Sequence, residues 1–185
     1  MTSDSSRDDH HETFSNDVKE HQMTVELDSG VHRCLLFSRP DSNIGRFRLT
    51  TWSGHLAVTG DMGDYIFCRL TDMFAFFRGR RIDAGYYAEK CVAGDIEEFR
   101  PDLWSSLVSN LLEMEAINES LVSEMSCDEP SSPDEAYDMM CAAGVGDASE
   151  YLQHLYDYTE HFIWCLNAIK WGIEQYDAHH ESKGE

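Results

Sequence analysis

The spacing of apolar residues changes near residue 71, from a strand-like period to a helix-like one. Before that point, five short runs either alternate apolar and polar residues or are rich in β-branched and aromatic residues, which is typical of strands. The runs are residues 23–28, 31–39, 47–52, 55–59 and 64–70, with turn-forming residues between them. Because short turns favour antiparallel neighbours, residues 21–70 are predicted to form a β-meander of about five strands.

After residue 71 the apolar residues recur at helical spacing. Thr71 or Asp72 is predicted to cap a short helix over residues 73–77, and a second short helix is expected to end near Gly94. Three further helices are predicted, over residues 102–125, 133–143 and 150–177. The predicted fold class is therefore α+β, an N-terminal antiparallel β-meander followed by a mostly helical C-terminal half.

The two ends of the chain lack this patterning. Residues 1–20 are rich in Ser, Asp and His and are predicted to form a disordered acidic tail, and residues 179–185 are expected to fray. Residues 21–178 are predicted to form a single α+β domain, β-rich over 21–70 and helical over 71–178. No apolar run reaches the roughly 18 residues of a membrane span, and the N-terminus lacks the basic and apolar regions of a secretory signal. We therefore expect a cytoplasmic protein.

The composition adds a strong charge asymmetry. The 185 residues carry 14 Lys and Arg against 35 Asp and Glu, a net charge of −21. Residues 30–100 are nearly neutral, whereas residues 101–185 carry two basic and eighteen acidic groups. This balance argues against direct nucleic-acid binding, which needs a basic surface, and against docking on an anionic membrane. The C-terminal excess indicates either a basic partner or a contribution to solubility.

Cysteine and histidine do not form a metal-binding pattern. The six cysteines stand among apolar residues without CxxC spacing, so they are predicted to be buried thiols rather than disulfides. His154, His161 and Cys165 fall at i, i+7 and i+11 of the predicted last helix, which could supply half of a zinc site. No complementary cluster occurs elsewhere in the sequence, so no metal or cofactor is expected.

The densest group of special residues lies in the block Trp52–Lys90. A Gly-His pair (residues 54–55), a Gly-Asp-Met-Gly turn (60–63), a Met-Phe-x-Phe-Phe-Arg helix (73–78) and an aromatic-Ala-Glu-Lys segment (87–90) follow one another. This block of about 40 residues resembles an uncharacterised family of phage, prophage and mobile-element proteins. The resemblance implies a phage-type origin and a location in the host cell cytoplasm. The family has no assigned chemistry, so the resemblance implies no catalytic residue.

The same block holds the candidates for chemistry. His55 and Asp61 are weak candidates for an acid–base pair, because no Ser or Cys stands near them in a nucleophile context. The Gly-Asp-Met-Gly segment lacks the Lys-Ser/Thr of a phosphate-binding loop and is interpreted as a hairpin turn. Arg78, Arg80 and Arg81 are candidates for an anion site, with arginines of the sheet. In so acidic a chain, pairing of these arginines with nearby carboxylates is the favoured interpretation.

The acidic residues of the predicted helices are the strongest candidates for function. At a spacing of three or four residues they give one charge per ~5 Å of helix, which imitates a row of phosphates. Such a surface would compete with nucleic acid for a basic cleft. The candidate partner-binding residues are Glu115, Glu119, Glu124, Asp134, Glu135, Asp138, Asp147, Glu150, Asp157 and Glu160.

Three functions are consistent with these patterns. The first is a phage-type acidic accessory protein that binds a basic host protein or nucleoprotein complex, such as a restriction or CRISPR complex, and inhibits it as a nucleic-acid mimic. The second is a small enzyme or ligand-binding protein for a phosphorylated molecule that uses the Arg-rich middle segment. The third is an interaction module that forms a homodimer through the aromatic last helix, although burial in one core would explain its apolar residues equally well.

Overall fold

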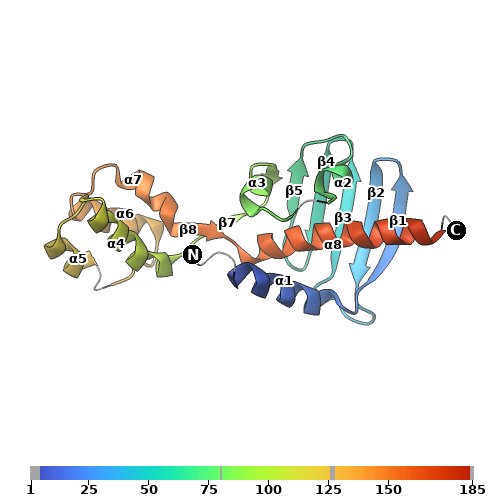
Figure 1. Ribbon diagram of the computed structural model, residues 1–185, viewed down its shortest axis with the longest axis horizontal. Coiled ribbons are helices and arrows are strands. Elements are labelled where there is room, and N and C mark those ends of the chain that lie inside the picture. Colours follow the sequence, from blue (N-terminus) through green and yellow to red (C-terminus); the bar gives the residue numbers. More distant parts are fainter. Residues whose placement is uncertain (1–4, 80, 126–127, 184–185) are drawn as a thin grey trace. The chain divides into compact units, whose positions relative to one another are not determined.

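The chain has an α+β fold, as the sequence predicts, with a six-stranded antiparallel sheet before a mostly helical half that ends in a long helix (Figure 1). The computed structural model describes residues 5–79, 81–125 and 128–183. The chain divides into two compact units, here called unit 1 (Met1–Ile96 with Thr159–Glu185) and unit 2 (Glu97–Tyr158). This division differs from the single domain expected over residues 21–178.

The sheet of unit 1 is a meander in which each strand pairs with the next in the chain. Its strands are β1 (Gln22–Ser29), β2 (His32–Ser38), β3 (Phe47–Trp52), β4 (His55–Gly60), β5 (Tyr65–Cys68) and β6 (Cys91–Ala93), and all pairs are antiparallel. Alternate residues such as Leu35, Phe37 and Leu49 are fully buried on one face. The predicted strands therefore form where period-two alternation lets one face of a strand enter the core.

A sixth strand replaces part of a predicted helix. The segment expected to be helical up to Gly94 instead forms α3 (Ala84–Ala88) and then β6, which pairs with β5. The backbone N–H of Cys68 donates to the carbonyl of Lys90 at 2.9 Å, so the chain joins the sheet edge directly after the helix. A free sheet edge offers a row of hydrogen-bonding groups, and this tertiary pairing outweighs weak local helix preference.

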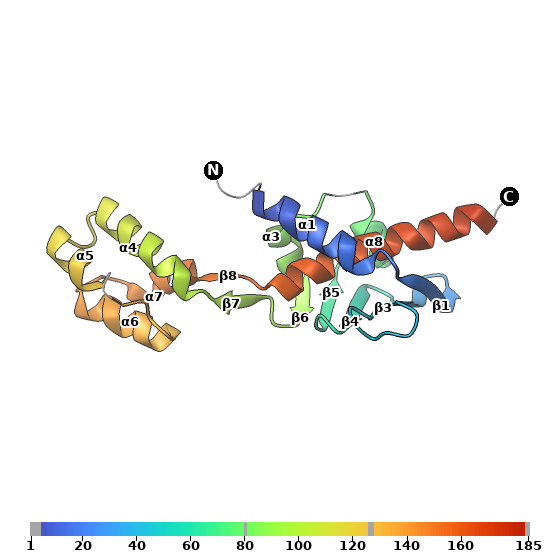
Figure 2. The same ribbon diagram turned by 90° about the horizontal axis from the view of Figure 1, so that it is seen from below.

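One long helix covers one face of the sheet. Helix α8 (Glu160–Lys183) crosses that face, with α1 (Ser5–Val18) beside it in both views (Figures 1 and 2). The short helix α2 (Met73–Phe77) also packs on α8, and its four buried apolar side chains join the same core. Gly172 faces the sheet so closely that a Cβ there would lie 2.7 Å from Leu49 Cδ1. The interior of unit 1 is therefore a layer of aromatic and aliphatic side chains between α8 and the sheet.

Helix α1 lies where a disordered tail is predicted. Its side chains Phe14 and Val18 are only 3% and 2% exposed. The ring of Phe14 meets the edge of Trp164 at a centroid distance of 5.1 Å, and Trp164 Nε1 donates to Asp17 Oδ2 at 2.9 Å. The prediction of a disordered tail was wrong because it relied on the average composition of residues 1–20, which is polar. Two apolar residues, Phe14 and Val18, are enough to pack this helix against α8.

Unit 2 has a small core of its own. It contains the two-stranded ribbon β7 (Glu97–Phe99) and β8 (Tyr156–Tyr158), and the helices η1 (Pro101–Leu103), α4 (Trp104–Glu113), α5 (Glu119–Met125), α6 (Pro133–Ala142), α7 (Ala148–Tyr151) and η2 (Leu152–Leu155). Trp104 is 1% exposed and its indole N–H donates to the carbonyl of Met125 at 2.7 Å. Leu111, Met140 and Leu155 are fully buried with it.

Two of the long predicted helices are interrupted. The helix expected over residues 102–125 breaks at Glu115, whose φ is 58°, and restarts at Glu119 after Asn118 Oδ1 accepts from the N–H groups of Ser120 and Leu121. The helix expected over residues 150–177 is divided by β8, and α8 begins after Thr159, whose Oγ1 accepts from the N–H of Phe162 at 3.0 Å. Asn and Thr are good helix N-caps, so both interruptions carried a local signal that helical periodicity masked.

Candidate functional site: an acidic inserted unit

Unit 2 is an insertion in the fold of unit 1. The chain leaves unit 1 at Ile96 and returns at Thr159, and the N–H of Thr159 donates to the carbonyl of Ile96 at 3.0 Å. Within unit 2, β7 and β8 then run antiparallel for three residue pairs. The 62 intervening residues can therefore be described as one element placed between β6 and α8.

This insertion carries most of the net charge. Its sequence has fifteen acidic residues, no lysine, and Arg100 as its one arginine. Arg100 makes a two-pronged contact with Asp102, at 2.8 Å and 2.7 Å, and these hydrogen bonds lower the pKa of the Asp102 carboxyl. Arg100 also interacts electrostatically with Asp157 and Glu98, so a single basic side chain serves all the carboxylates of unit 2.

The structure places most of the predicted partner-binding residues on this unit. Seven have exposed side chains in unit 2: Glu115, Asp134, Glu135, Asp138, Asp147, Glu150 and Asp157. The backbone of Glu119 and Glu124 belongs to α5, and the positions of their side chains lie outside the described part of the structure. Glu160 is in the first turn of α8 and so belongs to unit 1.

Helix α6 brings three of these acids together. Ser132 caps the helix, accepting from the N–H of Glu135 at 3.2 Å, and Pro133 occupies the first turn as the sequence predicts. Asp134 and Asp138 are one turn apart, which separates them by about 6 Å along the axis. Glu135 accepts from the backbone N–H and the hydroxyl of Ser131, and these bonds lower its pKa. The helix start also favours negative charge, so this end of α6 is a stable anionic surface.

The weak catalytic candidates are not brought together. His55 begins β4 and Asp61 follows its end, so the strand separates them by about 17 Å. The ring of His55 stacks on Trp52, with centroids 5.1 Å apart, and Asp61 accepts from the N–H of Gly45 at 2.9 Å. Both side chains therefore have structural roles in hairpin turns of the sheet.

The arginine candidates are dispersed as well. Arg78 pairs with Asp177 of α8 through two hydrogen bonds of 2.9 Å and 2.7 Å, and these bonds raise the pKa of its guanidinium. Arg80 lies outside the described residues, and Arg81 is exposed. On the sheet, Arg48 pairs with Glu26 at 2.8 Å. Pairing with carboxylates thus accounts for Arg48 and Arg78.

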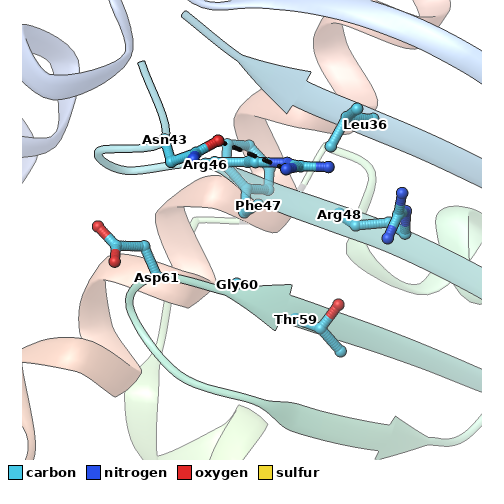
Figure 3. Close-up of a pocket in the computed structure, with 8 residues that line it drawn as sticks. All are labelled: Leu36, Asn43, Arg46, Phe47, Arg48, Thr59, Gly60 and Asp61. Atoms are coloured by element: carbon cyan, nitrogen blue, oxygen red, sulfur yellow. Dashed lines mark hydrogen bonds between the residues drawn. The ribbon is translucent and has the colours of Figure 1, made fainter.

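A shallow pocket of about 330 Å³ opens on unit 1 around Arg46 (Figure 3). The guanidinium of Arg46 donates to Asn43 Oδ1 at 3.5 Å, which is a long contact. Asp61, in the turn after β4, also lines the pocket. The lining residues are Leu36, Asn43, Arg46, Phe47, Arg48, Thr59, Gly60 and Asp61. A second hollow, which includes Arg39, shares Asn43 and Arg46. Arg46 and Arg39 make these two hollows a candidate site for a small anion in unit 1.

A polar network around the buried Arg33 of unit 1 is not evident from the sequence. Arg33 is 7% exposed and contacts both carboxylate oxygens of Asp72, at 2.9 Å and 3.2 Å. Arg33 Nε also donates to the Tyr176 hydroxyl, which in turn donates to Asp28 at 3.0 Å, and His180 contacts Asp28 at 2.9 Å. Among the residues of this network, only Asp72 was given a structural role from the sequence, as a candidate N-cap of the helix over residues 73–77. The network joins β1, β2, α2 and α8.

The half zinc site is not assembled on one helix. His154 belongs to η2, whereas His161 and Cys165 belong to α8. Burial raises the pKa of the Cys165 thiol to about 12, which keeps it protonated and a poor metal ligand. Within the described residues there is no group of three or more His, Cys, Asp or Glu side chains that could hold a metal ion.

The prediction that the cysteines are core residues is correct for Cys165 alone among those described. Cys34, Cys68 and Cys91 are half-buried and Cys141 is exposed. Strand periodicity explains Cys34 and Cys68, which alternate with the core-facing residues of β2 and β5. Cys127 lies outside the described residues.

Packing within one chain accounts for the aromatic residues of the last helix. Phe162 is buried against the sheet, Trp164 packs against α1, and Trp171 lies near Phe14 and Phe37. Tyr151 and Tyr158 belong to unit 2 and do not lie on α8. The wide apolar surface of α8 therefore faces the sheet on one side and α1 on another.

No helix in the described part of the chain is both long enough and apolar enough to cross a membrane. Comparison of the chain with protein families, with curated proteins and with solved structures gave no match. A functional conclusion therefore has to come from the distribution of charge and from the geometry of the two units.

Proposed function

We propose that this protein is a phage-type accessory protein that acts by binding, with unit 2 as a mimic of nucleic acid. In this proposal unit 2 occupies the nucleic-acid-binding surface of a host restriction or CRISPR complex, or of another nucleic-acid-handling machine. The observation that carries the proposal is the concentration of fifteen acidic residues and one internally paired arginine in a compact insertion.

Solubility alone would not require this concentration. Acidic residues improve solubility wherever they are exposed, so a solubilising role predicts a scatter over the whole surface. Unit 1 is larger, yet its twenty acidic residues are offset by thirteen basic ones. Many of those basic residues form ion pairs, for example Arg33 with Asp72 and Arg78 with Asp177. Two thirds of the net negative charge, −14 of −21, thus lies in unit 2, which is the smaller unit.

The charge spacing suits a mimic built from several helices. DNA carries one charge per ~3.4 Å of axis on each strand, whereas Asp134 and Asp138 give one per ~6 Å of α6. A single helix is therefore too sparse. The additional acids of α7, of the turns and of the β7–β8 ribbon raise the density around the unit.

Charge reversal provides the test. Glu115, Asp134 and Asp138 are changed together to Lys in tagged protein, and capture of purified host restriction or CRISPR complexes is measured from low to high salt. The matched control changes Glu12, Glu174 and Glu181, which are exposed in unit 1, so both variants gain six charge units. We expect the unit 2 variant to lose capture and the control to keep it, with wild-type binding weakened by salt. Capture that is insensitive to salt, or equal in the two variants, contradicts the proposal.

A second candidate function is binding of a small phosphorylated molecule at the Arg46 pocket (Figure 3). The observation that favours it is the guanidinium of Arg46, which lines the pocket and makes only a long contact, 3.5 Å, with Asn43 Oδ1. A thermal-shift series with nucleotides and sugar phosphates tests it. The expected response is a rise in melting temperature that Arg46→Ala removes.

A further inference from the structure

An apolar hollow lies on the acidic unit. It has a volume of about 520 Å³ and is lined by Leu112, Glu115, Ala116, Ile117, Asn118, Leu121 and Ala143. Five of these residues are apolar, and they belong to or pack against the core of unit 2. Its volume lies within the roughly 300–1,000 Å³ that is usual for ligand-binding clefts.

The hollow forms where α4 ends. Glu115 adopts a left-handed conformation, and the N–H groups of Ala116 and Ile117 both donate to the carbonyl of Leu111, at 2.9 Å and 3.4 Å. The chain therefore folds back across the end of α4. Next to this turn in the sequence, Met114 is 63% exposed.

The charge around the hollow restricts what can fill it. Glu113 and Glu115 are exposed beside it, and the one arginine of unit 2 is held by Asp102. Nucleic acid and an anionic membrane are repelled by this unit. A second copy of the chain is disfavoured as well, because both units carry net negative charge. The complementary occupant is a positively charged one that also presents apolar side chains.

We propose that the hollow receives an apolar side chain from a basic amphipathic segment of the partner protein, whose Lys or Arg residues meet the surrounding carboxylates. This inference rests on the proposed function and specifies the chemistry of its partner. Carboxylates alone would imitate the charge of a duplex. Any basic cleft could bind such a surface, so charge alone would not select one partner. An apolar anchor adds an interaction that depends on shape and resists salt, and it selects one basic surface among many.

Three synthetic helical peptides test the proposal with the full chain. The first has Lys on one face and Leu and Phe on the other, the second has Ser in place of these apolar residues, and the third has Gln in place of Lys. We expect the first to bind about tenfold more tightly than the second by calorimetry, and this ratio to persist in high salt. The third is expected to bind more weakly than the first at low salt.

A matched pair of variants locates the anchor. Ala143→Phe fills the hollow, whereas Ala142→Phe makes the same change at the neighbouring exposed position. We expect Ala143→Phe to abolish the preference for the first peptide over the second and Ala142→Phe to leave it unchanged. Methyl NMR of the wild-type chain gives an independent reading, since the signals of Leu112, Ile117 and Leu121 should shift with the first peptide and not with the second.

The outcomes separate this inference from the proposed function. If both Lys peptides bind equally, or if the methyl signals of the hollow do not respond, the anchor is wrong while charge recognition stands. If the Gln peptide binds as tightly as the first at low salt, the partner need not be basic and the inference fails. If neither Lys peptide binds at low salt, the inference and the proposed function fail together.

Discussion

At the scale of single residues, the Arg33–Asp72 pair shows how a buried charge is held in unit 1. Arg33 lies over the ring of Phe74, with its Cζ 4.6 Å from the ring centroid, and both of its arms contact Asp72. Asp72 also caps α2 by accepting from the N–H of Phe74 at 3.0 Å. One carboxylate therefore neutralises a buried guanidinium and starts a helix.

Asp72→Asn should reduce the free energy of unfolding by roughly 3 kcal/mol, because it leaves the Arg33 charge buried without a counter-charge. Urea unfolding of the variant and wild type at neutral pH measures this change. The control is Glu26→Gln, which breaks the exposed Arg48–Glu26 pair and should cost about 0.5 kcal/mol. Equal losses in the two variants would show that burial of Arg33 has no special cost.

The same pair predicts a pH dependence. Burial alone would raise the pKa of Asp72, but its hydrogen bonds with Arg33 outweigh burial and hold that pKa below its usual value. Stability from a lowered carboxyl pKa is fully present above the unfolded value of about 4 and is lost as the pH falls through the folded value. We expect the stability difference between wild type and Asp72→Asn to shrink below pH 4. A difference that stays constant between pH 6 and pH 3 contradicts this assignment.

At the scale of elements, the turns of the sheet were the most predictable feature. Strand β3 occupies the predicted residues 47–52, because period-two alternation and flanking glycines agree there. The predicted hairpin turn at residues 60–63 contains Gly60 with a φ of 157° and Gly63 with a φ of 111°. A Cβ on Gly60 would lie 2.3 Å from the carbonyl oxygen of Arg46. This turn therefore needs a glycine for close approach of two backbones.

Gly60→Ala should cost about 2 kcal/mol more than Gly54→Ala in the free energy of unfolding. Both glycines have positive φ in neighbouring turns, but no atom lies within 4 Å of a Cβ built on Gly54. Gly54→Ala thus adds only the left-handed strain of about 1–2 kcal/mol, while Gly60→Ala also forces the backbone of β3 to move. Chemical denaturation of the two variants gives the comparison, and similar costs would contradict the predicted clash.

Helix boundaries were less predictable than strands, since helical periodicity continues across real breaks. The apolar residues Leu152, Leu155 and Tyr156 keep a helical spacing up to β8, although Tyr156 is paired with Phe99 in the ribbon. The pairing partner lies more than fifty residues earlier, and no local pattern encodes it. The same limit applies to Phe14, whose burial depends on Trp164 and Trp171 of a distant helix.

Phe14→Ala should reduce the free energy of unfolding of unit 1 by about 3 kcal/mol, because it removes a nearly fully buried ring from the α1–α8 contact. The indole signals of Trp164 and Trp171 in NMR should move with it. Glu12→Ala, at an exposed position of the same helix, serves as the control. A stability unchanged by Phe14→Ala would restore the interpretation of residues 1–20 as a disordered tail.

At the scale of the whole molecule, the sequence revealed that negative charge accumulates toward the C-terminus, but not where the charged unit begins and ends. The acidic region that the sequence indicates begins at residue 101, close to the start of unit 2 at Glu97. Unit 2 ends at Tyr158, which lies inside the helix predicted over residues 150–177. The end is set by the contact of Ile96 with Thr159, which joins residues distant in sequence. The sequence predicted that acidic residues such as Asp134 and Asp138 are exposed. It did not predict that these two residues belong to unit 2 while Glu160 belongs to unit 1.

Unit 1 should fold without unit 2. Replacing residues 97–158 by Asn-Gly converts the hydrogen bond between Thr159 N–H and Ile96 carbonyl into that of a two-residue turn. We expect a monomer whose far-ultraviolet circular dichroism keeps the strand and α8 signals and whose free energy of unfolding changes by less than about 2 kcal/mol. The shortened chain should no longer bind the basic partner. An unfolded product would show that the two units depend on each other.

The close approach of Ile96 and Thr159 also has a consequence for the order of folding. Before unit 2 is formed, α8 must reach the sheet across a flexible loop of 62 residues, whose closure costs on the order of 3–4 kcal/mol of entropy. Once the β7–β8 ribbon pairs, that loop is already closed, and the two halves of unit 1 meet as near neighbours. Formation of unit 2 would then accelerate assembly of the sheet with its covering helix, so destabilising the core of unit 2 at Trp104 should slow the folding of unit 1.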